Sequence, residues 1–263
     1  MAILKRRRAV TSPIDTANKK SDAEFVKDYL ELEVPNTIPW KTSWTRPGTS
    51  EVYSIRLARP ANLDEATLEA CYTLIETTSR GDYEASKLRW RPDHKRQEMR
   101  LPDLRYIIVR RVGHGGSVSE TQEVNQADEA TNESDNSNSG NNGTIDTDQT
   151  AASAEDVCAF TSLMPTYEEG HAVVYCYEIH VSPSLQGSGL GRVLLGFQSI
   201  VAHNLGPPVE KVMLTCFLSN ERALRFYKHE GFMTDASAPT TRRLRRGKTF
   251  VPDYTILSKA VER

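Results

Sequence analysis

A short glycine-rich stretch has residues suited to binding a phosphate group. Gln186 begins the sequence Gln-Gly-Ser-Gly-Leu-Gly, which ends at Gly191 and follows the apolar, β-prone run 172–181. The residues 190–201 that come next are typical of a helix. The first N–H groups of a helix have no acceptor within it and lie at the positive end of its dipole, and glycine lets a ligand approach the backbone. The sequence therefore predicts a strand, a phosphate-binding loop and a helix.

The spacing of the glycines indicates which kind of phosphate loop this is. Gly187, Gly189 and Gly191 alternate, so neither the Walker pattern G-x-x-x-x-G-K-[ST] nor the Rossmann pattern G-x-G-x-x-G is present. The pattern Q-x-x-G-x-G resembles instead the acetyl-coenzyme A loop of the GNAT acetyltransferase superfamily. A plain glycine-rich turn is the alternative.

The strand before this loop carries two residues that could move a proton. Alternation along the strand predicts that the tyrosine, isoleucine and valine residues of 175–181 share one face and that Cys176, Glu178 and His180 share the other. Burial would raise the pKa of Glu178 toward that of a general base. Alternatively, Glu178 pairs with an arginine or lies solvated at a sheet surface. His180, which titrates near neutrality, is a rival base.

Length and composition exclude several classes of protein. The chain of 263 residues has no run of 18 apolar residues, so we expect no transmembrane span. The basic start, residues 1–8, is not followed by a long apolar core, which argues against a secretory signal. The four cysteines have no metal-like spacing and predict buried thiols in a reducing compartment, without a metal site.

Charge is segregated along the chain. Residues 114–156 contain ten acidic residues and no lysine or arginine, whereas the whole chain has a formal net charge of −2. This low-complexity insert is polar enough to predict disorder. Residues 1–20, which include the basic run Lys5–Arg8, predict a flexible basic arm that is either a targeting or nucleic-acid-binding segment or a solvated tail. Residues 21–263 then form a single domain that the insert interrupts.

The remaining elements follow from caps and periodicity. A capping box of Ser21 and Glu24 starts a helix, and Asn62 caps a longer one that ends near Gly81. The other predicted elements are strands over 51–57, 104–112, 157–163, 172–181, 211–217 and 254–261, helices over 190–204 and 220–230, and a basic loop over 240–248. The strand–helix–strand crossover implies a parallel pair in a mixed α/β fold.

A second motif strengthens the resemblance. Residues 220–232 match the pattern N-x-x-A-x-x-[FY]-Y-x-x-x-G-F, which resembles the second signature of the GNAT superfamily and comes one strand after the first. The resemblance implies the GNAT fold, a mostly antiparallel twisted sheet with a splayed parallel pair flanked by helices. It also implies transfer of an acetyl group from acetyl-CoA to an amine, with no metal.

A narrower resemblance concerns the substrate. Residues 175–178, 212–215 and 254–258, together with Tyr83, Trp90 and 95–99, resemble the NatD family of N-alpha-acetyltransferases, called Nat4 in fungi. The resemblance covers roughly residues 20–113 and 157–261. It implies a monomer in the cytoplasm and nucleus that acetylates the N-terminal amine of histones H-four and H-two-A, which begin Ser-Gly-Arg-Gly.

The resemblance also implies catalytic and substrate-binding residues. Glu178 would be the base, directly or through water, and Tyr227 the acid that faces the coenzyme sulfur, although packing is the alternative for Tyr227. The peptide would be bound by Tyr83, Glu168, Tyr175, Tyr177, Thr215 and Tyr254. Two positions depart from the family: Thr166 replaces a second acidic residue and Leu88 replaces a tryptophan.

For the coenzyme, the resemblance implies contacts with backbone and side chains. Ile179 and Val181 would pair with the pantetheine arm as a strand does, and Asn220 would also bind that arm. The pyrophosphate would rest on N–H groups of Gln186, Gly187, Ser188, Gly189, Leu190 and Gly191, with Arg192 nearby.

Two other functions remain open at this point. The chain could be a GNAT enzyme for a lysine side chain or a small-molecule amine, or a silent acetyl-CoA binder that acts through its basic arm. Without the insert the chain carries 33 basic against 25 acidic residues, a net charge of +8, which does not favour a basic histone tail. Either the positive charge lies elsewhere and serves docking to a ribosome or nucleosome, or the acidic insert attracts the tail.

Overall fold

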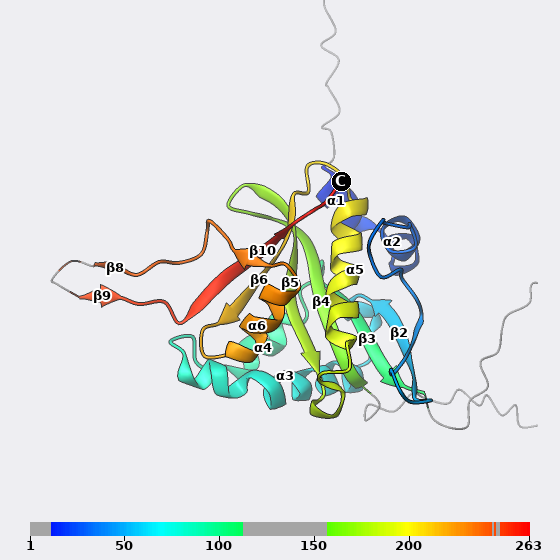
Figure 1. Cartoon of the computed structure of the whole chain (residues 1–263), viewed down its shortest axis with the longest axis horizontal. Coiled ribbons are helices and arrows are strands. Elements are labelled where there is room, and N and C mark those ends of the chain that lie inside the picture. The colour runs from blue at the N-terminus through cyan, green and yellow to red at the C-terminus, as the bar shows by residue number, and fades with distance from the viewer. Residues whose placement is uncertain (1–11, 113–156, 244, 246–247) are drawn as a thin grey trace, which may run out of the picture.

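One eight-stranded sheet organises the protein (Figure 1). The computed structural model describes residues 12–112, 157–243, 245 and 248–263. The strand order is β1-β2-β3-β4-β5-β6-β10-β7, and every neighbouring pair is antiparallel except β5 and β6. The predicted mixed α/β GNAT fold, mostly antiparallel with one parallel pair, is therefore confirmed.

The strands of this sheet are β1 (Ser43–Thr45), β2 (Val52–Ala58), β3 (Arg105–Arg111), β4 (Val157–Glu168), β5 (His171–Val181), β6 (Lys211–Phe217), β7 (Met233–Thr234) and β10 (Tyr254–Ala260). A separate two-stranded sheet pairs β8 (Arg242–Arg243) with β9 (Thr249–Phe250). The helices are α1 (Pro13–Lys19), α2 (Asp22–Tyr29), α3 (Glu65–Ala85), α4 (Pro92–Glu98), α5 (Leu190–Asn204) and α6 (Glu221–His229), with 3₁₀ turns η1 (Pro60–Asn62) and η3 (Pro183–Leu185).

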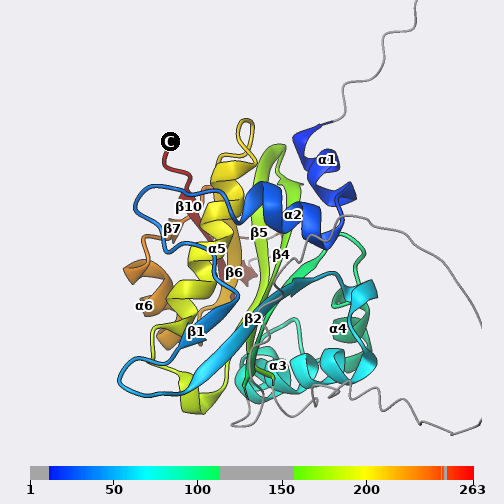
Figure 2. The same ribbon diagram turned by 90° about the vertical axis from the view of Figure 1, so that its right-hand side faces the viewer.

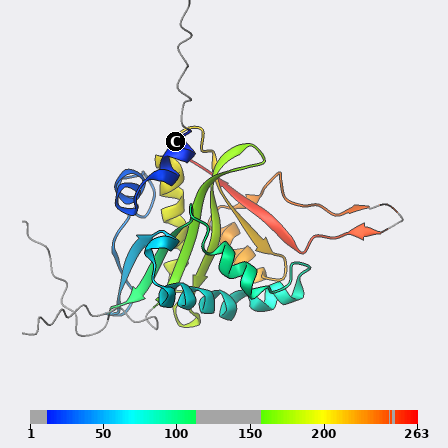
Figure 3. The ribbon, with the colours of Figure 1, turned by 180° about the vertical axis from the view of Figure 1, so that it is seen from behind.

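Helices cover both faces of the sheet. Residues of α1, α2, α5 and α6 pack into one apolar core with β4, β5 and β6, whereas α3 contributes to a second core with β3 and β4 on the opposite face. Figures 2 and 3 show α5 on one side of the strands and α3 on the other. Among the described helices, none combines the length and the apolar character needed to span a bilayer.

The parallel pair opens toward one end. The pairing of β5 with β6 runs from Val173 opposite Lys211 to Cys176 opposite Leu214 and stops there. Both strands continue beyond this point, so β5 from Tyr177 onward pairs with β4 only. The edge of β5 that faces away from β4 is thus without a strand partner over its last five residues.

Several predicted boundaries are wrong. Residues 13–20 are not part of a flexible arm, because Ser12 caps α1 and Ile14 and Ala17 are buried against the sheet. Asp64 rather than Asn62 caps α3, since the Asp64 side chain accepts from Thr67 N, and α3 continues through Gly81 to Ala85. The predicted basic loop over 240–248 contains strand β8. The capping box of Ser21 and Glu24 is confirmed.

Two predictions concern residues beyond this description. The flexible arm up to residue 11 and the disordered insert of residues 114–156 lie outside the described residues. The strands on either side of the insert, β3 and β4, pair as an antiparallel hairpin, as expected, with Arg110 opposite Val157.

A buried arginine on the sheet forms hydrogen bonds with helices α1 and α2. Arg105 on β3 is 0% exposed. Its guanidinium donates to Asp22 Oδ1 at 3.1 Å and to the carbonyl oxygens of Ala17 and Lys20, and it lies 4.0 Å from the ring centroid of Phe25. A single side chain therefore satisfies the carbonyl groups at the end of α1 and the acidic start of α2.

Replacing this arginine should destabilise the protein. The substitution Arg105→Leu removes the guanidinium donor from two carbonyl groups and from Asp22, which keeps its contacts with Arg59 and Asn62. The loss should lower the free energy of unfolding by about 2 kcal/mol in urea denaturation. The exposed Arg56 of β2 is the matched control, and Arg56→Leu should change stability by less than about 0.5 kcal/mol. Equal losses in the two variants would contradict the anchoring role.

Candidate active site

A bulge in β5 sets the orientation of the candidate base. Glu178 lies opposite Ser162 on β4, but the next pair joins Cys176 to Leu163, so Tyr177 is an extra residue in β5. An extra residue reverses the alternation of side chains on its two sides. Cys176 therefore belongs to the core under α5, whereas Tyr177 packs against the core under α3. The prediction that Cys176 shares a face with Glu178, and Tyr177 with Ile179, is wrong for this reason.

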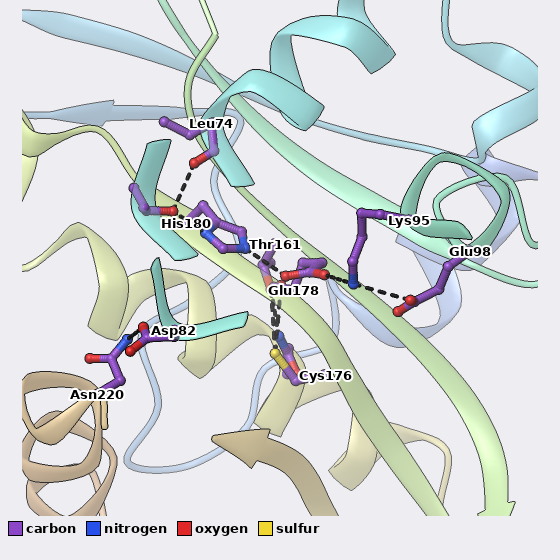
Figure 4. Close-up of polar contacts among 11 residues, drawn as sticks. Leu74, Asp82, Lys95, Glu98, Thr161, Cys176, Glu178, His180 and Asn220 are labelled. Atoms are coloured by element: carbon purple, nitrogen blue, oxygen red, sulfur yellow. Dashed lines mark hydrogen bonds and ion pairs between the residues drawn. The ribbon is translucent and has the colours of Figure 1, made fainter. Parts of the chain in front are cut away.

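Polar side chains beneath the sheet support the bulge. Thr161 on β4 donates its hydroxyl proton to the carbonyl oxygen of Glu178 at 2.7 Å, and Gln198 on α5 donates to the Thr161 hydroxyl at 2.7 Å (Figure 4). The Cys176 thiol also lies 3.6 Å from the same carbonyl. Gln198 is fully buried, and through Thr161 it connects α5 to the backbone of the candidate base.

The Glu178 carboxylate lies between a lysine and a histidine side chain on the α3 and α4 side. Lys95 Nζ on α4 is 2.7 Å from Glu178 Oε1, and His180 Nε2 is 2.6 Å from Oε2 (Figure 4). The Glu178 and Lys95 side chains are only 10% and 6% exposed. Burial by itself would raise the pKa of Glu178, but the Lys95 charge and the His180 hydrogen bond outweigh it and lower the pKa to about 2. The prediction of a raised pKa is therefore wrong.

Neither alternative for Glu178 describes the site fully. The carboxylate is paired, as one alternative had it, but its partner is a lysine rather than an arginine, and it is buried rather than solvated. Lys95 also contacts Glu98 Oε2 at 3.0 Å. Burial opposes the charge on Lys95, yet Glu178, Tyr83 and Glu98 together raise the pKa of Lys95. Glu178 and Lys95 thus keep each other ionised.

The hydrogen bonds of His180 define where its protons lie. Thr78 on α3 donates its only hydroxyl proton to the carbonyl oxygen of Leu74 at 2.7 Å. The Thr78 oxygen therefore accepts from His180 Nδ1, 2.6 Å away. The other nitrogen, Nε2, lies 2.6 Å from the Glu178 carboxylate. Glu178 and His180 are therefore placed to share a proton between them.

The predicted peptide-binding residues lie on the same side of the sheet. The Tyr83 ring on α3 contacts Phe217 of β6 and Trp90 at centroid distances of 4.8 and 5.3 Å. The Tyr175 hydroxyl is 2.7 Å from the Thr215 hydroxyl, and Tyr254 on β10 lies opposite Phe217. We call the set of Tyr83, Tyr175, Tyr177, Thr215 and Tyr254 the tyrosine face. It extends from the open end of the parallel pair along β5 and β6.

Glu168 lies further along this face, beside a pocket. Side chains of β6 alternate, so Val212 and Leu214 enter the core while Met213 points the other way with Thr215. Met213 lines a pocket of about 370 Å³ together with Glu168, Glu169, His171, Lys211, Asp235, Ala236 and Ser237. Asp235 is paired with Lys211 at 2.5 Å, whereas Glu168 and Glu169 form no ion pair with any described residue.

Tyr227 of α6 lies in the core at the parallel pair. It is 8% exposed and its ring contacts Phe226 and Phe232. Burial raises the pKa of Tyr227 well above that of free tyrosine, and the nearby groups of Cys176, Cys216 and Glu178 add to this effect. The phenol therefore keeps its proton near neutral pH. Whether it acts as the acid or only packs stays a prediction.

The glycine-rich loop has the backbone that the sequence predicts. Gly187 and Gly189 have φ values of 84° and 90°, and Gly189 is the N-cap of α5, so the N–H groups of Leu190 and Gly191 begin the helix. Gly191 has a packing role too, because a Cβ there would lie 3.2 Å from the Phe226 ring. Among the described residues, no three His, Cys, Asp or Glu side chains are grouped as a metal ion would need.

Side chains around the loop are already engaged with protein groups. Gln186 donates to the Val181 carbonyl oxygen and accepts from Arg222 at 2.5 Å. Arg192 Nε donates to both oxygens of Glu230. Asn220 caps α6 through Ala223 N and donates its amide to Asp82 of α3 at 3.0 Å (Figure 4). Contacts of Gln186, Arg192 and Asn220 with the coenzyme stay predictions, and each would use the donors that remain.

The sequence missed four residues of this site. Lys95, Thr78, Thr161 and Gln198 lie on four different elements, and only the fold brings them to Glu178 and His180, Gln198 through Thr161. One signal was present for Lys95, because it lies on the buried side of α4 with Met99 one turn later. A lysine on an apolar helix face requires a carboxylate partner.

The lowered pKa of Glu178 should appear in the acid stability of the protein. A carboxyl group whose pKa falls from 4.5 to about 2 on folding stabilises the protein above pH 4.5, and this contribution is lost as the pH falls toward 2. Between pH 5 and pH 2 the wild type should lose on the order of 3 kcal/mol more unfolding free energy than Glu178→Gln does. Parallel pH dependences in chemical denaturation would contradict this assignment.

Comparisons with known proteins agree with this geometry at the level of the family. The family model "Acetyltransferase (GNAT) family" matches residues 119–232, which include β4 through α6. Solved structures with some similarity include Arabidopsis thaliana NAA60 in complex with acetyl-CoA, at 12% identity over 80% of this chain and 98% of that one, with a TM-score of 0.45. PH1933 from Pyrococcus horikoshii OT3 has 15% identity over 80% and 100%, with a TM-score of 0.45.

A third structure is the ribosomal-protein-S18-alanine N-acetyltransferase from Escherichia coli, at 16% identity over 80% of this chain and 95% of that one, with a TM-score of 0.39. These values are too low to indicate what this chain acts on. The family model covers less than half of the chain, and the glycine-rich helix start and the one parallel pair in an antiparallel sheet are features that the GNAT resemblance predicts.

Proposed function

We propose that the protein acetylates the N-terminal α-amine of proteins that begin Ser-Gly-Arg-Gly, as histones H-four and H-two-A do. The observation that carries this proposal is the tyrosine face, where residues of α3, β5, β6 and β10 converge beside the open end of the parallel pair. Tyr83 packs on Trp90 and Tyr175 packs on Tyr177, each at a ring-centroid distance of 5.3 Å, so the rings form close-packed aromatic walls. Such walls suit an extended chain with small residues such as serine and glycine.

Charge along the face supports a basic substrate. Glu168 and Glu169 lie beyond Tyr175, and Met213, which lines the same pocket, is two residues from Thr215, or about 7 Å along the strand. An extended peptide whose amine lies at Glu178 would therefore carry its next few residues toward unpaired carboxylates. The net positive charge elsewhere does not oppose this, because ionic interactions in water are screened beyond about 10 Å.

The chain offers a place for acetyl-CoA, which supplies the acetyl group as a thioester. The helix start at Leu190 and Gly191 suits the pyrophosphate, since its N–H groups have no acceptor within α5. The unpaired edge of β5 suits the amide groups of the pantetheine arm, because Ile179 and Val181 lie beyond the last residue that pairs with β6. The fit of the pantetheine arm depends on the same separation of β5 from β6 that lies beside Glu178.

The chain's own residues then handle the proton of the substrate amine. Glu178, with a pKa of about 2, binds a proton too weakly to hold one taken from an amine with a pKa near 8. His180 lies directly behind it and accepts at Nε2. An N–H bond of the amine breaks, the Glu178 carboxylate receives the proton, and the proton comes to rest between Glu178 and His180. Lys95 keeps the carboxylate oriented throughout.

The setting of this activity is part of the proposal. The protein would act as a monomer in the cytoplasm and nucleus, where it would meet histone tails, and its basic segments would dock to a ribosome or a nucleosome. None of the free cysteines Cys71, Cys158, Cys176 and Cys216 forms a disulfide, which suits a reducing compartment.

A peptide assay tests the substrate directly. With acetyl-CoA, the peptide Ser-Gly-Arg-Gly-Lys-Gly-Gly-Lys should gain one acetyl group on the serine α-amine, located by mass spectrometry. The same peptide with a blocked N-terminus should gain none. Acetylation of the blocked peptide would indicate a lysine acetyltransferase, and no transfer to either peptide despite acetyl-CoA binding would indicate a small-molecule enzyme or a silent binder.

The proton pathway predicts distinct effects of two substitutions. Glu178→Gln should lower kcat by roughly 10²- to 10⁴-fold with little change in KM, because the amide cannot receive the proton. His180→Gln keeps a hydrogen-bond donor toward Glu178 but cannot store a proton, so its kcat should fall. The increase of kcat between pH 6 and pH 8 should also change shape. A pH profile identical to that of the wild type would show that His180 holds no proton during turnover.

A further inference from the structure

The hairpin of β8 and β9 stands apart from the rest of the protein. Its two strands form a sheet of their own, with Arg242 opposite Phe250 and Arg243 opposite Thr249. In Figures 1 and 3 it projects from the body along the longest axis of the molecule, on the side away from α2 and β2. No strand of the main sheet pairs with it among the described residues, so its side chains do not serve the core.

Charge on this hairpin is of one sign. Residues 236–252 contain five arginine or lysine residues and no aspartate or glutamate. Arg242, Arg243, Arg245 and Lys248 are exposed, and none of them forms an ion pair with a described carboxylate. Neighbouring residues in a strand point to opposite sides, so Arg242 and Arg243 give both faces of the ribbon a positive charge. Most other arginines on the described surface have a carboxylate partner, such as Arg80, Arg96, Arg100 and Arg111.

The base of the hairpin is fixed to the loop that follows α3. Lys87 donates its backbone N–H to Asp253 at 2.5 Å and its ammonium group to the Val251 carbonyl oxygen. The same ammonium lies 4.8 Å from the Phe250 ring centroid, and the Arg242 guanidinium lies 5.5 Å from it. Cation–π contacts and hydrogen bonds thus hold the ribbon in one direction. Arg89 and Arg91 follow Lys87 and are exposed, which extends the positive surface.

We propose that this hairpin binds the phosphate backbone of duplex DNA without reading its sequence. Unpaired arginines with two exposed faces suit phosphate groups, because a guanidinium donates in a planar fork. A two-stranded ribbon fits the major groove of B-form DNA, about 12 Å wide, whereas the corresponding groove of A-form RNA is too narrow for side chains. The binding does not depend on which peptide the enzyme acetylates.

The position of the hairpin connects this surface to the site. Three residues separate Phe250 from Tyr254 of the tyrosine face, and Tyr254 pairs with Phe217 beside Tyr83. DNA bound on the hairpin would therefore lie next to the place where the substrate N-terminus enters. If the proposed substrate is right, the DNA that is wrapped around the histones would hold a histone tail close to the candidate active site.

Binding of a fluorescein-labelled 20-base-pair DNA of arbitrary sequence to the full chain, measured by fluorescence anisotropy, tests the proposal. About four phosphate contacts predict a decrease in affinity of roughly 10²-fold between 50 and 200 mM salt. The triple variant Arg242→Gln, Arg243→Gln, Arg245→Gln should lose most of this binding and most of the salt dependence. Its acetylation of the free peptide should be unchanged.

A matched control uses basic residues on the opposite side of the molecule. Lys27, Lys41 and Arg56 are exposed, and the variant Lys27→Gln, Lys41→Gln, Arg56→Gln makes the same change in net charge. It should bind DNA nearly as the wild type does. Equal loss in both triple variants would reduce the effect to net charge and overturn the proposal. Tighter binding of an RNA duplex than of the DNA would also overturn the proposal. The same holds if polyglutamate displaces the labelled DNA at a lower concentration of negative charge than unlabelled DNA does.

Discussion

The buried charge of Glu178 is the constraint on which the rest of the site depends. A carboxylate that loses most of its water must be neutralised or paired, because an isolated ion in the interior costs several kcal/mol. Here the charge is kept, since Lys95 and His180 contact one oxygen each. Lys95 in turn requires Glu98 nearby. The four ionisable groups Glu178, Lys95, His180 and Glu98 therefore occupy one small volume.

Three layers of the fold meet this requirement together. The bulge at Tyr177 turns Glu178 toward α3 and α4, and the contact from Gln198 through Thr161 fixes the bulge from the α5 side. Helix α4 brings Lys95, and α3 brings Thr78 to orient the His180 ring. The same bulge falls where β5 separates from β6, so one irregularity in the backbone aims the carboxylate and opens the strand edge for the coenzyme arm.

Sequence reasoning reached the elements that local chemistry determines. The glycine-rich loop, the capping box at Ser21 and the bounds of β6 follow from short patterns, and the structure places them as expected. It failed where a long-range contact decides. Strict alternation placed Cys176 beside Glu178, because a bulge depends on the register with β4 and leaves no mark in β5 itself. Burial alone suggested a raised pKa, because the partner lysine is 83 residues away in the chain.

The prediction of a flexible arm over residues 1–20 failed for a related reason. Composition suggested a tail, yet Pro13–Lys19 is a helix whose two apolar residues, Ile14 and Ala17, suffice to bury one side against β4. Arg105 of β3 holds this helix in place through the Ala17 carbonyl group. Nothing in the composition of residues 1–20 indicates a contact with that strand. The predicted peptide-binding residues come from the resemblance alone, because no periodicity would bring Tyr83, Tyr175 and Tyr254 to one face.

The pairing of β3 with β4 has a consequence for how such a chain can change. Arg110 lies opposite Val157, so the chain leaves the sheet and re-enters it at neighbouring positions, whatever lies between them. Closing a longer loop costs free energy only with the logarithm of its length, so growth from a short turn to about 45 residues costs roughly 2 kcal/mol. Insertions at this point therefore leave the sheet, and with it the geometry of Glu178, unchanged. New sequence can accumulate there without any adjustment of the candidate site residues.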